Sequence, residues 1–206
     1  MIVLHALKYS RATRVLWLLA DLGQACSRID YDRTEAFGAP DELGRVHPLG
    51  KSPVIQDGRE KIAESATILR YLVDKFEDRS HSPPRDTTTF WQHEALFDYV
   101  EASFADVVMQ AIRPKFQGKD VPHDAMATLD THLSYIARSF QGGPLLFGDH
   151  PTLADIQMSY PMALLARFDL LKGHPKIEAY WQALQAQPGY EAAVEAAGPM
   201  APPENS

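Results

Sequence analysis

The stretch His-Pro-Leu-Gly-Lys-Ser-Pro-Val-Ile, residues 47–55, is followed by an Asp-Gly pair at 57–58 and by Ile-Ala-Glu-Ser at 62–65. Asp-Gly between two short apolar runs is a strong signal for a tight β-hairpin. Pro53 has no backbone N–H, so it suits the first position of a strand and not its middle. The stretch therefore predicts a loop, two short antiparallel strands and, directly after the second strand, a helix.

Ser65 stands at the start of this helix, which the apolar periodicity predicts over residues 66–76. The residues that share its apolar face are Ile68, Leu69, Leu72, Val73 and Phe76. Serine is a preferred N-cap residue, so we expect Ser65 to cap the helix. The free N–H groups at a helix N-terminus attract a carboxylate, and Glu64 beside them offers a carboxylate to an ammonium group. The pair fits a ligand with an amino-acid end.

The segments Gly-Lys-Ser-Pro-Val-Ile and Glu-Ser-Ala-Thr-Ile-Leu resemble the glutathione site of the cytosolic glutathione S-transferases, in the bacterial and fungal serine-type branch with the His-Pro-Leu-Gly-Lys-Ser-Pro motif. The resemblance implies a cis bond between Ser52 and Pro53, and a pairing of the Ser52 backbone with the cysteinyl unit of glutathione. It implies that Glu64 and Ser65 hold the γ-glutamyl end, and we expect Lys51 near the glycyl carboxylate. Taken singly, Ser65 could be only a helix cap and Pro53 only a strand boundary.

The segments before this stretch predict alternating strands and helices. Residues 2–7 have the pattern of a buried strand, residues 26–31 that of a second, parallel strand, and residues 41–45 that of a short helix. Between the strands, residues 11–22 predict a helix whose inward residues are Val15, Leu16, Leu18, Leu19 and Leu22. The order β-α-β-α-β-β-α is that of a thioredoxin-like domain, and the resemblance implies this fold for residues 1–77.

The remainder of the chain is predicted to be a linker and an all-α, helical-bundle domain. Residues 78–86 are polar and end near two prolines, which indicates an interdomain linker, and residues 87–206 form the helical domain. Its predicted helices cover 87–112, 123–140, 152–168 and 176–187. Thr152 and Asp155 have the spacing of a capping box, to which we assign a role in folding and not in catalysis. We expect the tail from Gly198 to be poorly ordered.

The composition excludes several classes of partner. The chain has 206 residues, enough for one or two domains, and its net charge of −7 argues against nucleic acid, which needs a basic face. Residues 1–76 hold 11 Lys and Arg against 10 Asp and Glu, whereas residues 77–206 hold 9 against 17. An anionic ligand would therefore be attracted to the first part only. No apolar run approaches the roughly 18 residues of a membrane helix, and no signal peptide is evident, so we expect a cytoplasmic protein with no membrane partner.

No metal site is expected. No two of the eight histidines lie three to five residues apart, which excludes the usual helical metal pair. The single cysteine, Cys26, excludes a disulfide framework and a Cys-x-x-Cys motif. Its place in a predicted strand favours a small buried thiol.

The turn Lys8-Tyr9-Ser10-Arg11 joins the first strand to the first helix. A free thiol has a pKa near ~8.5, which a helix N-terminus and a hydrogen-bond donor lower. The segment that activates glutathione in this family is similar to Ser10-Arg11 followed by Val-Leu-Trp-Leu-Leu at residues 15–19. The resemblance implies that the Ser10 hydroxyl stabilises the glutathione thiolate and that Arg11 belongs to the same catalytic turn. Tyr9 is the alternative donor, and Ser10 could also be only a helix cap. A cysteine-type subgroup carries Cys here, so mixed-disulfide chemistry is not expected of this chain.

The leading hypothesis is a detoxification enzyme, a glutathione transferase that uses glutathione as co-substrate and conjugates it to a small hydrophobic electrophile. The alternatives are a glutathione-dependent peroxidase or disulfide reductase, and a non-catalytic ligand-binding member of the fold. We expect the electrophile pocket at Lys8 and, in the helical domain, at Tyr99, Ser103 and Val107. The resemblance further implies a homodimer.

Overall fold

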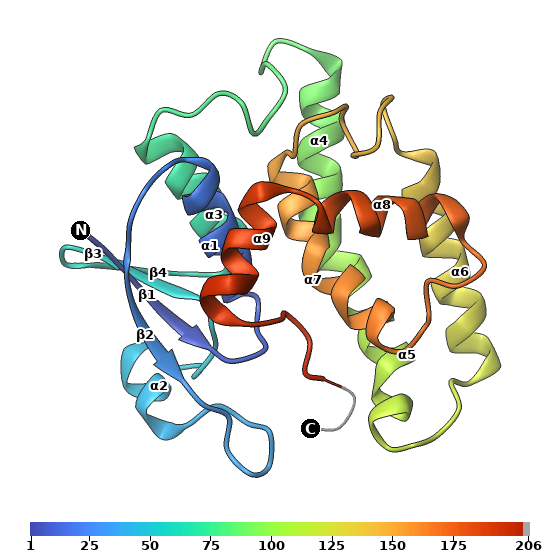
Figure 1. The fold of residues 1–206 in the computed structure, drawn as a ribbon, viewed down its shortest axis with the longest axis horizontal. Helices are drawn as coiled ribbons and strands as arrows, with labels where there is room; N and C mark the ends of the chain where they lie inside the picture. The colour runs from blue at the N-terminus through green and yellow to red at the C-terminus, as the bar shows by residue number, and fades with distance from the viewer. Residues whose placement is uncertain (204–206) are drawn as a thin grey trace. The chain divides into compact units, whose positions relative to one another are not determined.

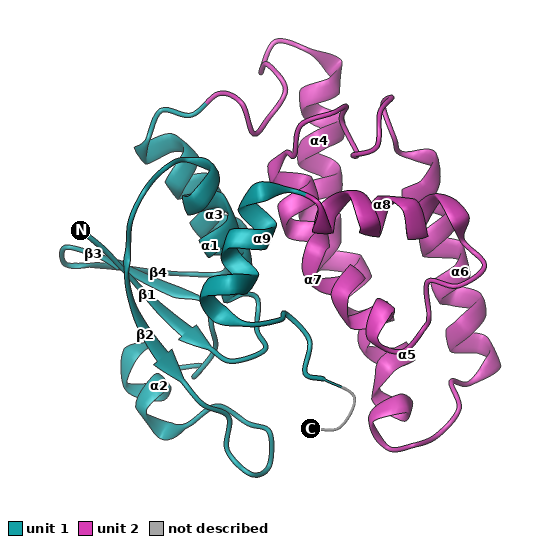
Figure 2. Ribbon diagram, in the orientation of Figure 1, with its two compact units in different colours: residues 1–78, 187–206 teal, residues 79–186 magenta. Residues whose placement is uncertain are grey.

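The computed structural model describes residues 1–203, and its internal contacts divide the chain into two compact units. Among the described residues, the first unit holds residues 1–78 and 187–203, and the second unit holds residues 79–186 (Figure 2). This division differs from the predicted one at two places. The C-terminal segment belongs to the first unit, and the linker residues from Arg79 onward belong to the helical unit.

The first unit is built on a four-stranded mixed sheet in the order β2-β1-β3-β4 (Figure 1). Its strands are β1 (Ile2–Leu7), β2 (Ser27–Tyr31), β3 (Val54–Asp57) and β4 (Glu60–Ala63). β1 pairs in parallel with β2 and antiparallel with β3, and β3 and β4 form the predicted hairpin. Gly58 turns the hairpin with a positive φ of 62°, a conformation that glycine adopts without steric cost.

The helices of the first unit are α1 (Ala12–Asp21), α2 (Asp41–Val46), α3 (Ser65–Lys75) and α9 (Pro188–Ala197). Figure 1 shows α1, α3 and α9 on one face of the sheet and α2 on the other. The predicted thioredoxin-like fold of the first domain is confirmed. α9 was not among the predicted helices, because Pro188-Gly189 has the composition of a turn, whereas in the structure the proline occupies the first turn of the helix.

α9 packs closely on α1. Trp17 of α1 is fully buried, and its ring meets the edge of the Tyr190 ring at a centroid distance of 5.4 Å. A Cβ at Gly189 would overlap the carboxylate of Asp21 and lie 2.5 Å from Trp17 Cδ1, so only glycine permits this approach. The predicted inward residues Leu16 and Leu22 are only half-buried, whereas Trp17, which Tyr190 of α9 contacts, is fully buried.

The C-terminal segment is attached to β2 through Arg28. Arg28 Nη1 donates to the carbonyl oxygen of Ala196, in the last turn of α9, at 2.7 Å. Met200 is buried, so the predicted poor order of the tail does not apply to the described part. Residues 204–206, the end of that predicted segment, lie outside the described residues.

Asp57 connects the hairpin to α3. Its carboxylate lies 2.5 Å from Lys75 Nζ and accepts a hydrogen bond from Tyr71 Oη at 2.6 Å. These hydrogen bonds, that of Lys75 first and that of Tyr71 second, hold the pKa of Asp57 below its ordinary value. The folded state therefore favours the ionised carboxylate.

The second unit is helical. Its helices are α4 (Thr88–Tyr99), the π-helix η1 (Val100–Phe104), α5 (Ala105–Phe116), α6 (His123–Arg138), α7 (Leu153–Arg167) and α8 (Pro175–Gln185). The predicted single helix over 87–112 is thus interrupted by a π-turn, which stacks Tyr99 on Phe104, five residues later, at a centroid distance of 5.9 Å. None of the described helices in either unit is long and apolar enough to cross a membrane.

α7 is buried nearly all round, and the N–H groups of its first turn all find acceptors. The N–H of Leu153 donates to the carbonyl of His81, and that of Ala154 to His93 Nε2 at 3.3 Å. Thr152 and Asp155 form the predicted capping box, in which Asp155 Oδ2 accepts from the Thr152 N–H at 2.9 Å. Since His81 and His93 come from the linker and from α4, this helix start organises the helical unit.

Candidate functional site

The Ser52–Pro53 bond is cis, as predicted. Ladder pairing between β1 and β3 ends at the pair of His5 and Val54, directly after the proline. Ser52 Oγ accepts a hydrogen bond from the N–H of Leu7 at 2.9 Å and donates one to the carbonyl of His5 at 3.1 Å. The side chain of Ser52 thus fastens the loop to the backbone of β1.

Ser10 lies beside this loop. It is buried, and its Oγ lies 3.3 Å from Ser52 Oγ. Ser10 Oγ also accepts a hydrogen bond from the N–H of Ala12, the first residue of α1, at 3.2 Å. The structure therefore brings the predicted thiolate donor, the cis-proline loop and a helix N-terminus together.

Tyr9, the alternative donor, makes contacts with a different loop. Its φ of 55° is unusual for a residue with a side chain, and Arg33 Nη2 donates to its carbonyl oxygen at 2.8 Å. The Tyr9 ring stacks on Phe37 at a centroid distance of 6.4 Å, and Lys8 Nζ lies 5.4 Å from the ring centroid. Arg11 occupies the N-cap position of α1 and is half-buried.

Ser65 is the first residue of α3 and not its N-cap, which corrects the prediction. Glu64 occupies the cap position, with a φ of 67° and a ψ of 117°. Such a backbone conformation costs about 1–3 kcal/mol in a residue with a side chain and is concentrated at functional sites. The Ser65 hydroxyl is buried and accepts a hydrogen bond from Arg14 Nη1 at 3.1 Å. Glu64 itself is exposed.

Arg14 is a candidate site residue that the sequence analysis missed. The side chain comes from α1, is fully buried and reaches the start of α3 at Ser65. A guanidinium stays protonated in proteins, so Arg14 places a buried positive charge next to the N-terminus of α3. The available signal was a charged residue within the apolar run that begins the first helix.

The other predicted residues are more dispersed. Lys51 is exposed in the loop before the cis-proline bond. In the helical unit, Ser103 is exposed and Val107 is buried. The Tyr99 hydroxyl forms a hydrogen bond with His132 Nδ1 of α6 at 2.7 Å, and burial raises the pKa of Tyr99 well above its ordinary range. That these residues line an electrophile pocket with Lys8 stays a prediction.

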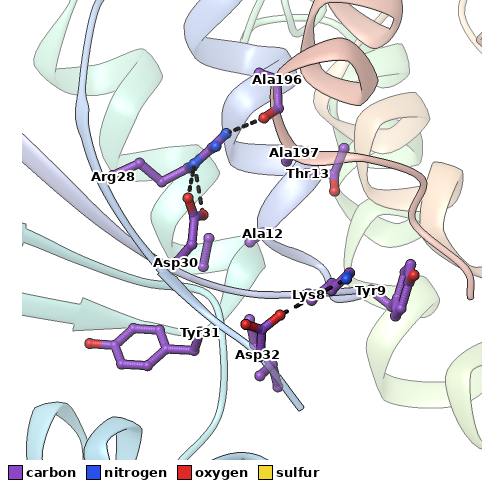
Figure 3. Close-up of a pocket in the computed structure, with 12 residues that line it drawn as sticks. Lys8, Tyr9, Ala12, Thr13, Arg28, Asp30, Tyr31, Asp32, Ala196 and Ala197 are labelled. Atoms are coloured by element: carbon purple, nitrogen blue, oxygen red, sulfur yellow. Dashed lines mark hydrogen bonds and ion pairs between the residues drawn. The ribbon is translucent and has the colours of Figure 1, made fainter.

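A cavity of about 180 Å³ lies beside the Lys8–Tyr9 turn, within the first unit. Its lining comes from the β1–α1 turn, the first residues of α1, β2 and the last residues of α9 (Figure 3). Arg28 is paired there with Asp30 at 2.7 Å, and Lys8 Nζ lies 3.9 Å from Asp32. The sequence analysis anticipated only the turn, because the other walls depend on tertiary contacts.

Cys26 is half-buried just before β2, and burial raises the pKa of its thiol, which disfavours the nucleophilic thiolate. Among residues 1–203, no group of three or more His, Cys, Asp or Glu side chains could hold a metal ion.

Comparisons with known proteins identify the same family in the N-terminal and the C-terminal parts of the chain. Residues 1–74 match the family model described as glutathione S-transferase, N-terminal domain, and residues 100–188 match the C-terminal domain. Glutathione S-transferase 1 of Saccharomyces cerevisiae is 29% identical, with 95% of each chain covered. Glutathione S-transferase theta-1 of Bos taurus is 31% identical over 72% of this chain and 67% of its own. A solved glutathione S-transferase from Actinobacillus pleuropneumoniae superposes with a TM-score of 0.82 at 28% identity, covering 97% of this chain and 94% of that one.

Proposed function

Because the chain belongs to the glutathione S-transferase family, we propose that it is a serine-type member in which Ser10 stabilises the thiolate of bound glutathione. The observation that carries this proposal is the distance of 3.3 Å between Ser10 Oγ and Ser52 Oγ, which joins the thiolate donor to the cis-proline loop. The Tyr9 ring contacts Phe37 instead, which supports Ser10 over Tyr9. The conjugated partner is a hydrophobic electrophile.

The cysteinyl unit of glutathione pairs with the backbone of Ser52, so its sulfur lies next to the Ser10 hydroxyl and the start of α1. A free thiol titrates near ~8.5, and each unit by which its pKa falls corresponds to about 1.36 kcal/mol in favour of the thiolate. The hydrogen bond from Ser10 and the positive end of α1 both act on the charged form. The thiol proton leaves to solvent, and the thiolate attacks the electrophile.

The γ-glutamyl end binds at the start of α3. Its carboxylate accepts hydrogen bonds from Ser65 and from the N–H groups of the first helical turn, and the buried Arg14 behind Ser65 adds positive potential. The carboxylate of Glu64 receives the ammonium group. Lys51, exposed in the loop, interacts with the glycyl carboxylate.

The proposal is tested by calorimetric titration with glutathione and by a turnover assay with a generic chromogenic electrophile. We expect glutathione-dependent turnover, and we expect Ser65→Ala to weaken glutathione binding by about 1.5–3 kcal/mol, the value of a hydrogen bond to a charged group. Lys119→Ala, in the other unit, is the matched surface control and should bind as the wild type does. Unchanged affinity in Ser65→Ala would remove the assignment of the γ-glutamyl site. Turnover with hydroperoxides but not with electrophiles would favour the peroxidase alternative.

We further propose a cytoplasmic homodimer with two-fold symmetry, in which the first domain of one chain binds the helical domain of the other. The family resemblance supports it, and so does the contrast between a first part near +1 and a second part near −8 in net charge. Light scattering at micromolar concentration tests it. A monomer mass there would contradict it.

A further inference from the structure

The hydrogen bonds around Ser52 determine which way its hydroxyl points. A serine hydroxyl has one proton and two acceptor positions. A carbonyl can only accept, so the contact of 3.1 Å with the His5 oxygen uses the Ser52 proton. A backbone N–H can only donate, so the contact of 2.9 Å with Leu7 uses one acceptor position. The second acceptor position of the Ser52 oxygen is therefore the only one left for a further hydrogen bond.

This acceptor faces Ser10 across 3.3 Å, so the Ser10 hydroxyl is the donor in that contact. The Ser10 oxygen also accepts the N–H of Ala12 at 3.2 Å. Both partners therefore orient the Ser10 O–H toward the cis-proline loop. A freely rotating hydroxyl would instead have to be ordered when the ligand arrives, at a cost in entropy.

We propose that the hydroxyl of Ser52 is a positioning group for the thiolate donor: before the ligand arrives it holds the Ser10 O–H toward the cis-proline loop, beside which the glutathione sulfur will lie. The inference rests on the proposed function, and it assigns to the Ser52 side chain a role separate from that of its backbone. Ser52 does not touch the sulfur and acts through Ser10.

The geometry also explains how the thiolate replaces Ser52 as acceptor. At 3.3 Å the contact between the hydroxyls is long for an O–H···O hydrogen bond, whose usual length is about 2.7–2.8 Å, and is correspondingly weak. A charged acceptor forms a hydrogen bond roughly twice as strong as a neutral one. The Ser10 O–H therefore turns from Ser52 to the sulfur by rotation about its own C–O bond, while Ser52 stays attached to β1.

The experiment measures the pKa of glutathione bound to the full chain, from the ultraviolet absorbance of the thiolate as a function of pH. Ser52→Thr and Ser52→Val form a matched pair, because they have the same shape and differ in the hydroxyl alone. Ser52→Ala provides a smaller substitution that avoids any steric overlap. Each is made in the wild type and in Ser10→Ala, and melting temperatures record the loss of the hydrogen bonds to β1.

We expect Ser52→Ala and Ser52→Val to raise the pKa of the bound thiol by about half a unit to one unit, because the Ser10 hydroxyl is then ordered only when the thiolate forms, at the cost of immobilising one side chain. Ser52→Thr, which retains the hydroxyl, should keep the pKa of the bound thiol at its wild-type value. In the Ser10→Ala background the same substitutions should leave the thiol pKa unchanged, because no donor remains to be positioned. The melting temperature should fall in both backgrounds, because the hydrogen bonds of Ser52 to β1 are lost in each.

Two results would overturn the inference while leaving the proposed function intact. One is a thiol pKa that shifts in Ser10→Ala but not in Ser52→Ala or Ser52→Val. The other is an equal shift by Ser52→Val in both backgrounds, which would mean that Ser52 acts on the sulfur independently of Ser10. A wild-type protein that shows no bound thiolate would overturn the proposed function and the inference together.

Discussion

Replacement of the buried Arg14 provides a stringent test of the γ-glutamyl site. Arg14 Nη1 donates to Ser65 Oγ at 3.1 Å, and a carboxylate bound to that hydroxyl would add a second hydrogen bond of about 2.7 Å. The guanidinium nitrogen and the carboxylate oxygen would then be at most about 6 Å apart. With an effective dielectric constant of about 20, two unit charges at that distance attract each other by roughly 3 kcal/mol.

We therefore expect Arg14→Met to weaken glutathione binding by about 2–3 kcal/mol, which corresponds to a roughly 30- to 150-fold rise in Kd. Arg14→Lys is the control that retains the charge but loses the planar fork, and it should lie between wild type and Arg14→Met. Isothermal titration calorimetry gives the Kd, and urea unfolding is recorded for each variant. The second measurement is needed because replacing a buried charge by an apolar side chain can change stability in either direction.

The pKa of the bound thiol should be nearly independent of Arg14. Arg14 acts at the γ-glutamyl end, so Arg14→Met should change the pKa of the bound thiol far less than Ser10→Ala does. A folded Arg14→Met variant that binds glutathione as tightly as the wild type would refute the assignment of Arg14 to this site. The assignment would also be refuted if Arg14→Lys lost as much affinity for glutathione as Arg14→Met, because the shape of the side chain and not its charge would then be responsible.

Three further predictions concern other parts of the first unit. Ser10→Ala should lower turnover roughly ten- to a hundredfold, because it removes one hydrogen bond to a charged acceptor, which contributes about 1.5–3 kcal/mol. Tyr9→Phe should leave the pH–rate profile unchanged. A shifted profile in Tyr9→Phe alone would assign the donor to Tyr9. Gly189→Ala should destabilise the protein by about 1–3 kcal/mol through overpacking of α9 on α1, and equal urea midpoints would contradict that close approach. Hydrogen bonds from Lys75 and Tyr71 of α3 lower the pKa of Asp57 in the folded protein. The ionised carboxylate therefore stabilises the fold above the unfolded pKa near ~4, and this contribution is lost as the pH falls through the lower folded pKa. Asp57→Asn should therefore flatten the decline in stability below about pH 4, and parallel curves for variant and wild type would show that the network does not contribute.

The sequence by itself determined those features whose signals are local. Asp57-Gly58 predicted the hairpin, the apolar spacing after Ser65 predicted α3, and Thr152 with Asp155 predicted the start of α7. Each depends on neighbours within a few residues, because turn conformations and helix caps are formed by adjacent backbone groups. The cis bond before Pro53 was correct through the resemblance to a family and not through the residue pattern.

Only the tertiary structure decided the features that join distant segments. Arg14 lies 51 residues from Ser65, and Ser10 lies 42 residues from Ser52. Sequence periodicity predicts that one face of a helix is buried, but it does not show what a second layer such as α9 will cover, so the burial of Trp17 was missed. The residue types that build the site were thus readable in the chain, whereas their hydrogen-bond partners exist only because folding brings separate segments within contact distance.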